Sequence, residues 1–132
     1  MQVAGNKKEL SLAQKQNVIF RLLRTLCEEL LEGSKKDLAA CLRVSAASVS
    51  RWFQDELCTV PHNGNDYQVI LHLLAIHRSL CAIFTSPEDR RIWFKSPNSD
   101  LEGKSPEDMA KSGLAGLIHV RQYLDFERGL GV

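Results

Sequence analysis

The sequence predicts an all-α fold, and three observations lead to this prediction. Apolar residues recur at spacings of three and four along most of the 132-residue chain, which is the period of an amphipathic helix. Serines at positions 11, 34, 86 and 105 are each followed three positions later by a polar or acidic residue, a pattern typical of helix N-caps. No segment shows a convincing strand pattern. We therefore expect an N-terminal helix-turn-helix bundle followed by a second small helical domain.

The first predicted helix covers residues 12–32 and ends before Gly33. Its expected buried stripe consists of Ile19, Leu22, Leu23, Leu26, Cys27 and Leu30. After the turn-rich segment 61–66, a second long helix is expected at 67–84, with apolar residues on more than one face. Such a helix favours either a central packing element or a dimer interface. Shorter helices are expected at 87–95, 106–111 and 114–128, which divides the chain into domains 1–62 and 63–132.

Residues 37–52 have the pattern of a helix-turn-helix, whose second helix lies in the DNA major groove. Val49 and Trp52 give the second helix an inward face, and Ser45 is expected to cap it. The pattern departs from the usual one at Arg43, where a positive φ often selects glycine. An ordinary helical hairpin is the alternative. The candidate DNA contacts are Lys35, Arg43, Ser45, Ala46, Ala47, Ser50, Arg51 and Gln54.

Composition and charge are those of a globular protein rather than of a strongly basic nucleic-acid binder. The net charge is +1 and the isoelectric point is about 7.7. Residues 1–55 carry nine Lys and Arg against six Asp and Glu, whereas residues 56–132 carry eight against ten. A mildly basic front and a mildly acidic back fit a protein with two different partners.

The sequence shows no recognisable catalytic motif, metal-ligand spacing or membrane-spanning run. The four cysteines lie far apart without a Cys-x-x-Cys pair, so we expect buried reduced thiols in a cytoplasmic protein. His72 and His77 are five positions apart and lack a Glu that would complete a metal set. We find no secretory signal, membrane-spanning run, phosphate loop or nucleophile motif. We expect neither an enzyme nor a cofactor.

The segment 93–106 is a second informative region. Trp93 precedes a Pro97-Asn98 turn, Leu101 is expected to anchor the loop to the core, and Gly103 permits an unusual φ. By itself this pattern predicts a tight structural connector between two helices.

The C-terminal residues resemble a known family. The segment that runs from 76–80 through the connector 93–106 to the closing stretch 120–129 resembles the toxin-binding domain of Xre/MbcA/ParS-type antitoxins. The closing stretch contains Tyr-Leu-Asp and ends in Arg-Gly. Phe94 stands where the family usually has leucine. The resemblance covers roughly the last sixty residues, and the helix-turn-helix precedes it in the expected order.

This resemblance implies an antitoxin of a type II toxin–antitoxin system of the RES-Xre kind. The partners would be a cognate RES-type toxin, which depletes NAD, and operator DNA, with the antitoxin acting as a homodimer and repressing its own operon. A stand-alone helix-turn-helix repressor is the alternative, and an enzyme whose active site has no recognisable motif is kept as a third possibility behind these two. The operator sequence, the stoichiometry and the toxin's chemistry stay open. The implied toxin-facing residues are Trp93, Asn98, Tyr123, Arg128, Gly129, Leu130, Gly131 and Val132. The two glycines at 129 and 131 would make the tail 130–132 thin enough to enter a cleft. Without the resemblance, a frayed terminus is the simpler interpretation of this tail.

Overall fold

The computed structural model describes residues 9–129, and this part of the chain contains helices and no strand. The all-α prediction is therefore confirmed, and the predicted helices agree with the observed ones to within about two residues, as helix ends usually allow. The elements in chain order are α1 (Leu12–Leu31), α2 (Lys35–Leu42), α3 (Ala46–Asp55), α4 (Asn65–Ile83), α5 (Pro87–Lys95), the 3₁₀ turn η2 (Ser99–Leu101), α6 (Pro106–Ser112) and α7 (Leu114–Glu127).

Serine side chains begin five of these helices, as the sequence predicts. The hydroxyls of Ser11, Ser34, Ser45, Ser86 and Ser105 each accept a hydrogen bond from a backbone N–H in the first turn of the helix that follows. Each such bond satisfies a donor that has no partner within the helix. The start of each of these helices is consequently set by local sequence.

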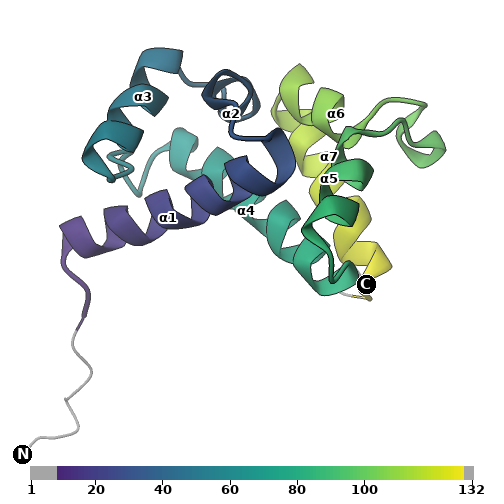
Figure 1. Ribbon diagram of the computed structural model, residues 1–132, viewed down its shortest axis with the longest axis horizontal. Helices are drawn as coiled ribbons and strands as arrows, with labels where there is room; N and C mark the ends of the chain where they lie inside the picture. Colours follow the sequence, from purple (N-terminus) through teal and green to yellow (C-terminus); the bar gives the residue numbers. More distant parts are fainter. Residues whose placement is uncertain (1–8, 130–132) are drawn as a thin grey trace, which may run out of the picture.

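Helix α4 is the central element of the fold (Figure 1). It packs against α7, α2, α1 and α5, while α1 also contacts α5 and α2 contacts α6. One continuous buried cluster includes Leu26 of α1, Leu42 of α2, Leu73 of α4, Phe94 of α5 and Leu124 of α7. The predicted domain boundary, between residues 62 and 63, lies in the loop 61–64 before α4. Helices on both sides of this loop contribute side chains to the one buried cluster.

Two predictions about buried residues are wrong. Leu22, assigned to the buried stripe of α1, is 48% exposed, and Phe20 is buried instead. Cys81, expected to be a buried thiol, is exposed, whereas the other three cysteines are buried. Both residues lie at the margin of an apolar stripe, and spacing alone does not tell how much of that stripe the neighbouring helices cover.

Within residues 9–129, no helix combines the length and apolar character that crossing a membrane requires.

Candidate functional site

The outward face of α3 is displayed to solvent. Ala46, Ala47, Ser50, Arg51 and Gln54 are all exposed. The opposite face is held in the core by the buried side chains of the same helix, Val49 and Trp52. Small side chains and a hydrogen-bonding arginine on an exposed helix face are suited to close approach to a groove.

The first turn of α3 is fixed by a short hydrogen-bond chain. Ser45 Oγ accepts from the Ser48 N–H at 3.0 Å and donates to Ser48 Oγ at 2.9 Å. Arg51 Nη2 lies 3.4 Å from the same Ser48 Oγ, so the guanidinium rests over the start of the helix. Ser45 thus serves as the predicted cap, and Arg51 is the charged group displayed on the exposed face.

The other two predicted DNA contacts lie differently. Arg43 adopts the left-handed conformation, with φ 61°, as the turn pattern predicts. Its Nη1 lies 3.8 Å from where a Cβ on Gly113 would stand, so the side chain reaches toward the start of α7. The ammonium of Lys35 lies 4.9 Å from the ring centroid of Phe53, a cation–π contact that draws it onto α3.

Trp93 and Tyr123 form a second, partly buried cluster at the C-terminal end of the fold. Their rings stack with centroids 6.3 Å apart and planes 17° apart, joining α5 to α7. The Tyr123 hydroxyl donates to Asp100 Oδ2 at 2.9 Å, and Asn98 Oδ1 accepts from the Asp100 N–H at 2.8 Å. Two of the predicted toxin-facing residues, Asn98 and Tyr123, therefore bond to Asp100, and Trp93 joins them through its stack on Tyr123. Sequence reasoning missed Asp100. We name Trp93, Asn98, Asp100 and Tyr123 the aromatic cluster.

The ionisation of Tyr123 follows from this setting. Burial and the neighbouring carboxylate of Asp100 both raise the pKa of the Tyr123 hydroxyl. The phenol consequently stays protonated and able to donate at neutral pH.

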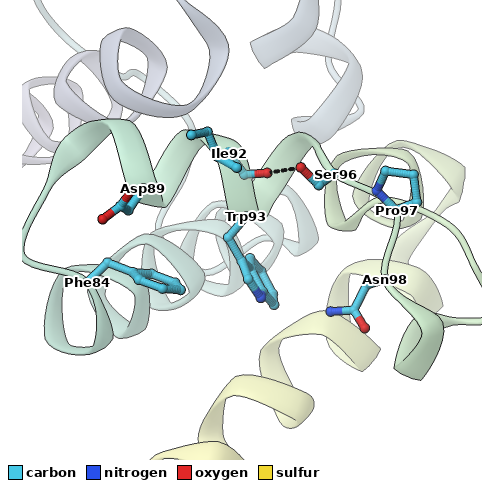
Figure 2. Close-up of a pocket in the computed structure, with 7 residues that line it drawn as sticks. All are labelled: Phe84, Asp89, Ile92, Trp93, Ser96, Pro97 and Asn98. Atoms are coloured by element: carbon cyan, nitrogen blue, oxygen red, sulfur yellow. Dashed lines mark hydrogen bonds between the residues drawn. The ribbon is translucent and has the colours of Figure 1, made fainter.

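A pocket of about 300 Å³ opens beside the aromatic cluster (Figure 2). Figure 2 shows Trp93 between Phe84 and Asn98, with Ile92 and Pro97 completing the wall. Ile92 is 52% exposed and adds apolar surface at this wall of the pocket. The pocket has one ionisable lining residue, Asp89, so its chemistry suits an apolar side chain of a partner. Its full lining is Phe84, Asp89, Ile92, Trp93, Ser96, Pro97 and Asn98.

The end of α7 returns to α4. Arg128 Nη1 donates to Ser79 Oγ at 3.1 Å, and Ser79 is buried. Arg128 is therefore partly engaged within the fold, and Gly129 follows it with φ 76°. Phe126 is 70% exposed and lies one helical turn from Tyr123, outside the buried stripe of α7. Because Phe126 falls outside the apolar stripe of α7, its exposure could have been predicted from the sequence. The predicted contacts Leu130, Gly131 and Val132 lie outside the described residues.

A third group of chemically capable side chains joins α1 to α4. One ligand atom from each of Glu29, His77 and Cys81 lies within 4.8 Å of the others. Sequence reasoning missed this group because Glu29 is remote in sequence from the other two. The spacing of four between His77 and Cys81, which places them on one face of α4, was the available signal.

Comparison with known proteins agrees with the resemblance seen in the C-terminal residues. Residues 79–129 match the family model of the antitoxin Xre/MbcA/ParS C-terminal toxin-binding domain. The match contains the whole aromatic cluster and Arg128. The chain is also 37% identical over 59 residues to protein y4oB of Sinorhizobium fredii, across 44% of this chain and 46% of that relative. The aligned region thus spans less than half the length of the curated relative it matches.

Proposed function

We propose that this chain is the antitoxin of a type II toxin–antitoxin system. It binds and blocks a cognate RES-type toxin through its C-terminal half and represses its own operon through α3. The match of residues 79–129 to an antitoxin toxin-binding domain carries this proposal and supports the antitoxin role. That match identifies neither the class of the toxin nor the binding of DNA. These two parts of the proposal rest on the motifs in the sequence.

The aromatic cluster and the adjacent pocket support the proposed toxin-binding surface. Tyrosine and tryptophan supply much of the free energy in protein interfaces, because they bury large areas with few rotatable bonds. Trp93 and Tyr123 are held in place before binding by their mutual stacking and by Asp100. A surface ordered in advance loses less conformational entropy when a partner docks.

The exposed face of α3 supports the proposed DNA-binding surface. Figure 1 shows α3 at the opposite end of the molecule from α5 and α7. One chain could therefore contact DNA and toxin at the same time without the two partners meeting on one face. Arg51 would contact a base edge or phosphate, and its neighbours allow the helix to approach closely.

We further propose that the chain acts as a homodimer. A two-fold protein matches an operator made of two related half-sites. The groove between α1 and α4 supplies an apolar surface that can meet a second copy of itself, as a two-fold interface requires. It has a volume of about 580 Å³, with an apolar part formed by Ile19, Leu22, Leu71, Leu74 and Ala75 and a polar part formed by Gln68, His77, Arg78 and Arg121.

Two point variants test both binding functions in one experiment. The chain is co-expressed with the product of the adjacent reading frame, and growth, co-purification and operator binding by gel shift are measured. Trp93→Ala should lose toxin capture and protection while retaining operator binding. Arg51→Ala should show the reverse. If the wild-type chain neither co-purifies with that product nor protects against it, the proposed antitoxin function is wrong.

A further inference from the structure

We propose that Glu29, His77 and Cys81 form a binding site for a zinc-like transition-metal ion. His77 Nε2 lies 2.8 Å from Glu29 Oε1, and Cys81 Sγ lies 3.6 Å from His77 Nε2. His77 and Cys81 are one turn apart on α4, and Glu29 faces them from α1. Neither the toxin-binding nor the DNA-binding proposal uses these three side chains, and His77 also lines the groove between α1 and α4 that we propose for the dimer.

The spacing of the nitrogen and sulfur ligand atoms suits tetrahedral coordination. Bonds of about 2.0 Å to nitrogen and about 2.3 Å to sulfur at tetrahedral angles separate those two atoms by about 3.5 Å. The observed separation of Nε2 from Sγ is 3.6 Å. The oxygen and nitrogen ligands would stand about 3.3 Å apart, so the Glu29 carboxylate must withdraw by roughly half an ångström. Rotation about the bonds of a glutamate side chain supplies such a movement.

Arg90 orients the carboxylate as an outer partner of a metal ligand would. Its Nη1 donates to Glu29 Oε1 at 2.9 Å, and its Nε donates to the Phe84 carbonyl at 3.0 Å. Without an ion, His77 and Arg90 both bond to Glu29 Oε1. The bond from His77 is given up when its Nε2 ligates an ion, whereas the bond from Arg90 is kept. Ligating carboxylates commonly have such a second partner. Although burial acts in the other direction, the bonds from His77 and Arg90 lower the pKa of Glu29, so the carboxylate is ionised at neutral pH.

The ligand types select the class of ion. Thiolate and imidazole bind zinc and related ions, whereas calcium and magnesium require oxygen ligands. When the ion binds, the Cys81 thiol loses its proton to solvent. His77 Nε2 gives up the proton that it shares with Glu29 to solvent, and neutral His77 then carries its one ring proton on Nδ1. Thiolate plus carboxylate then exceed the charge of Arg90 by one negative unit. Three protein ligands and the exposed position of Cys81 leave the fourth coordination position to water. The bound ion would fasten α1 to α4, between the two proposed binding surfaces.

Zinc binding to the full chain tests this proposal without toxin or DNA, so its result is independent of the proposed function. After treatment with a chelator, Zn²⁺ binding is measured by calorimetry and Co²⁺ binding by the near-ultraviolet thiolate-to-cobalt band. Since Cys81 is the exposed cysteine and the other three are buried, its reaction with a disulfide reagent gives a further readout. We expect zinc to suppress that reaction and Co²⁺ to produce the thiolate band.

Variants distinguish the site from nonspecific binding. Cys81→Ser and His77→Gln should each weaken zinc affinity at least about tenfold. His119→Gln is the matched control, because His119 is exposed on α7 and lies outside the cluster; it should bind zinc as the wild type does. If His77→Gln proves unstable, Cys81→Ser decides the question, because its side chain is exposed. Equal zinc affinity in Cys81→Ser and wild type, or unchanged thiol reactivity with zinc, would overturn the proposal.

Discussion

The ammonium of Lys111 lies 2.9 Å from Oδ1 of Asp37, and this ion pair joins α6 to α2. Lys111 also lies 2.9 Å from Glu107 Oε2, and Glu107 Oε1 is 3.2 Å from the ammonium of Lys95. The resulting chain of charges runs from the first helix of the helix-turn-helix to α5, which carries Trp93. The helix that precedes α3 and the helix that carries Trp93 are therefore connected by partly buried ion pairs as well as by the shared core.

Asp37→Asn should lower the free energy of unfolding by about 1 kcal/mol at neutral pH, the upper range for an incompletely buried pair. The bond from Lys111 holds the pKa of Asp37 below its ordinary value of 3.8. The stabilising contribution is therefore complete above about pH 5, where the unfolded carboxyl is ionised. It is lost as the pH falls through the lower pKa of the folded state. Urea unfolding of wild type and variant between pH 2 and pH 7 should give curves that converge in acid.

Asp89→Asn is the matched control for this prediction. Asp89 stands in the first turn of α5 as Asp37 does in α2, and its N–H likewise bonds to the serine cap. It therefore reproduces the helix-dipole contribution without the lysine. An equal loss of stability in both variants would mean that the dipole, rather than Lys111, accounts for the effect of Asp37.

Sequence reasoning predicted the features whose causes are local. The serine caps depend on neighbours within four residues, and the positive φ of Arg43 follows from the turn between α2 and α3. The contact of Tyr123 with Asp100 and that of His77 with Glu29 join residues far apart in the chain. Spacing along one helix holds no information about such partners, which only tertiary packing brings together.

The left-handed conformation of Arg43 predicts opposite effects on stability and DNA affinity. Arg43→Gly should raise the free energy of unfolding by roughly 0.5–1 kcal/mol. A left-handed residue with a Cβ is strained by about 1–2 kcal/mol, and glycine removes this strain. Part of the gain is offset because glycine increases the conformational entropy of the unfolded chain. Arg43→Ala keeps the strain and removes only the guanidinium. Both variants should bind operator DNA more weakly, with a salt slope reduced by about one if Arg43 contacts a phosphate.

Thermal unfolding and gel shifts at two salt concentrations measure these outcomes. Unchanged operator affinity in both variants would remove Arg43 from the proposed DNA contacts. A Gly variant no more stable than the Ala variant would contradict the strain argument.

Tyr123 allows stacking and hydrogen bonding to be separated at the proposed toxin-binding surface. Tyr123→Phe keeps the stack on Trp93 and loses the bond to Asp100, so toxin affinity should fall modestly, by up to about 1 kcal/mol. Tyr123→Ala removes both and should lose at least about 2 kcal/mol, roughly thirtyfold in Kd. Calorimetric titration with purified toxin measures both values. Equal affinities for Ala variant and wild type would place the toxin elsewhere.

Leu22 provides the test of the proposed homodimer. Leu22→Glu places a charge in the apolar groove between α1 and α4, and it should convert the dimer to monomer in sedimentation equilibrium. The monomer should keep its fold, because Leu22 is 48% exposed. Ile92→Glu is the control, since Ile92 is similarly exposed but lines the other pocket; it should remain dimeric and bind toxin less well. A Leu22→Glu chain that stays dimeric would assign the dimer contact to another surface.

Removal of residues 130–132 tests the proposed entry of the tail into the toxin. The shortened chain still ends after Arg128 and Gly129, so the bond from Arg128 to Ser79 that ties α7 to α4 is kept. We therefore expect unfolding temperature and operator binding to match the wild type, while protection from the toxin weakens. Arg128→Ala, which removes that bond, should instead lower the unfolding temperature together with protection. The two variants thus separate a tail that contacts the toxin from a residue that holds the toxin-binding surface in place. Full protection by the shortened chain would leave the aromatic cluster and its pocket as the sole proposed contact.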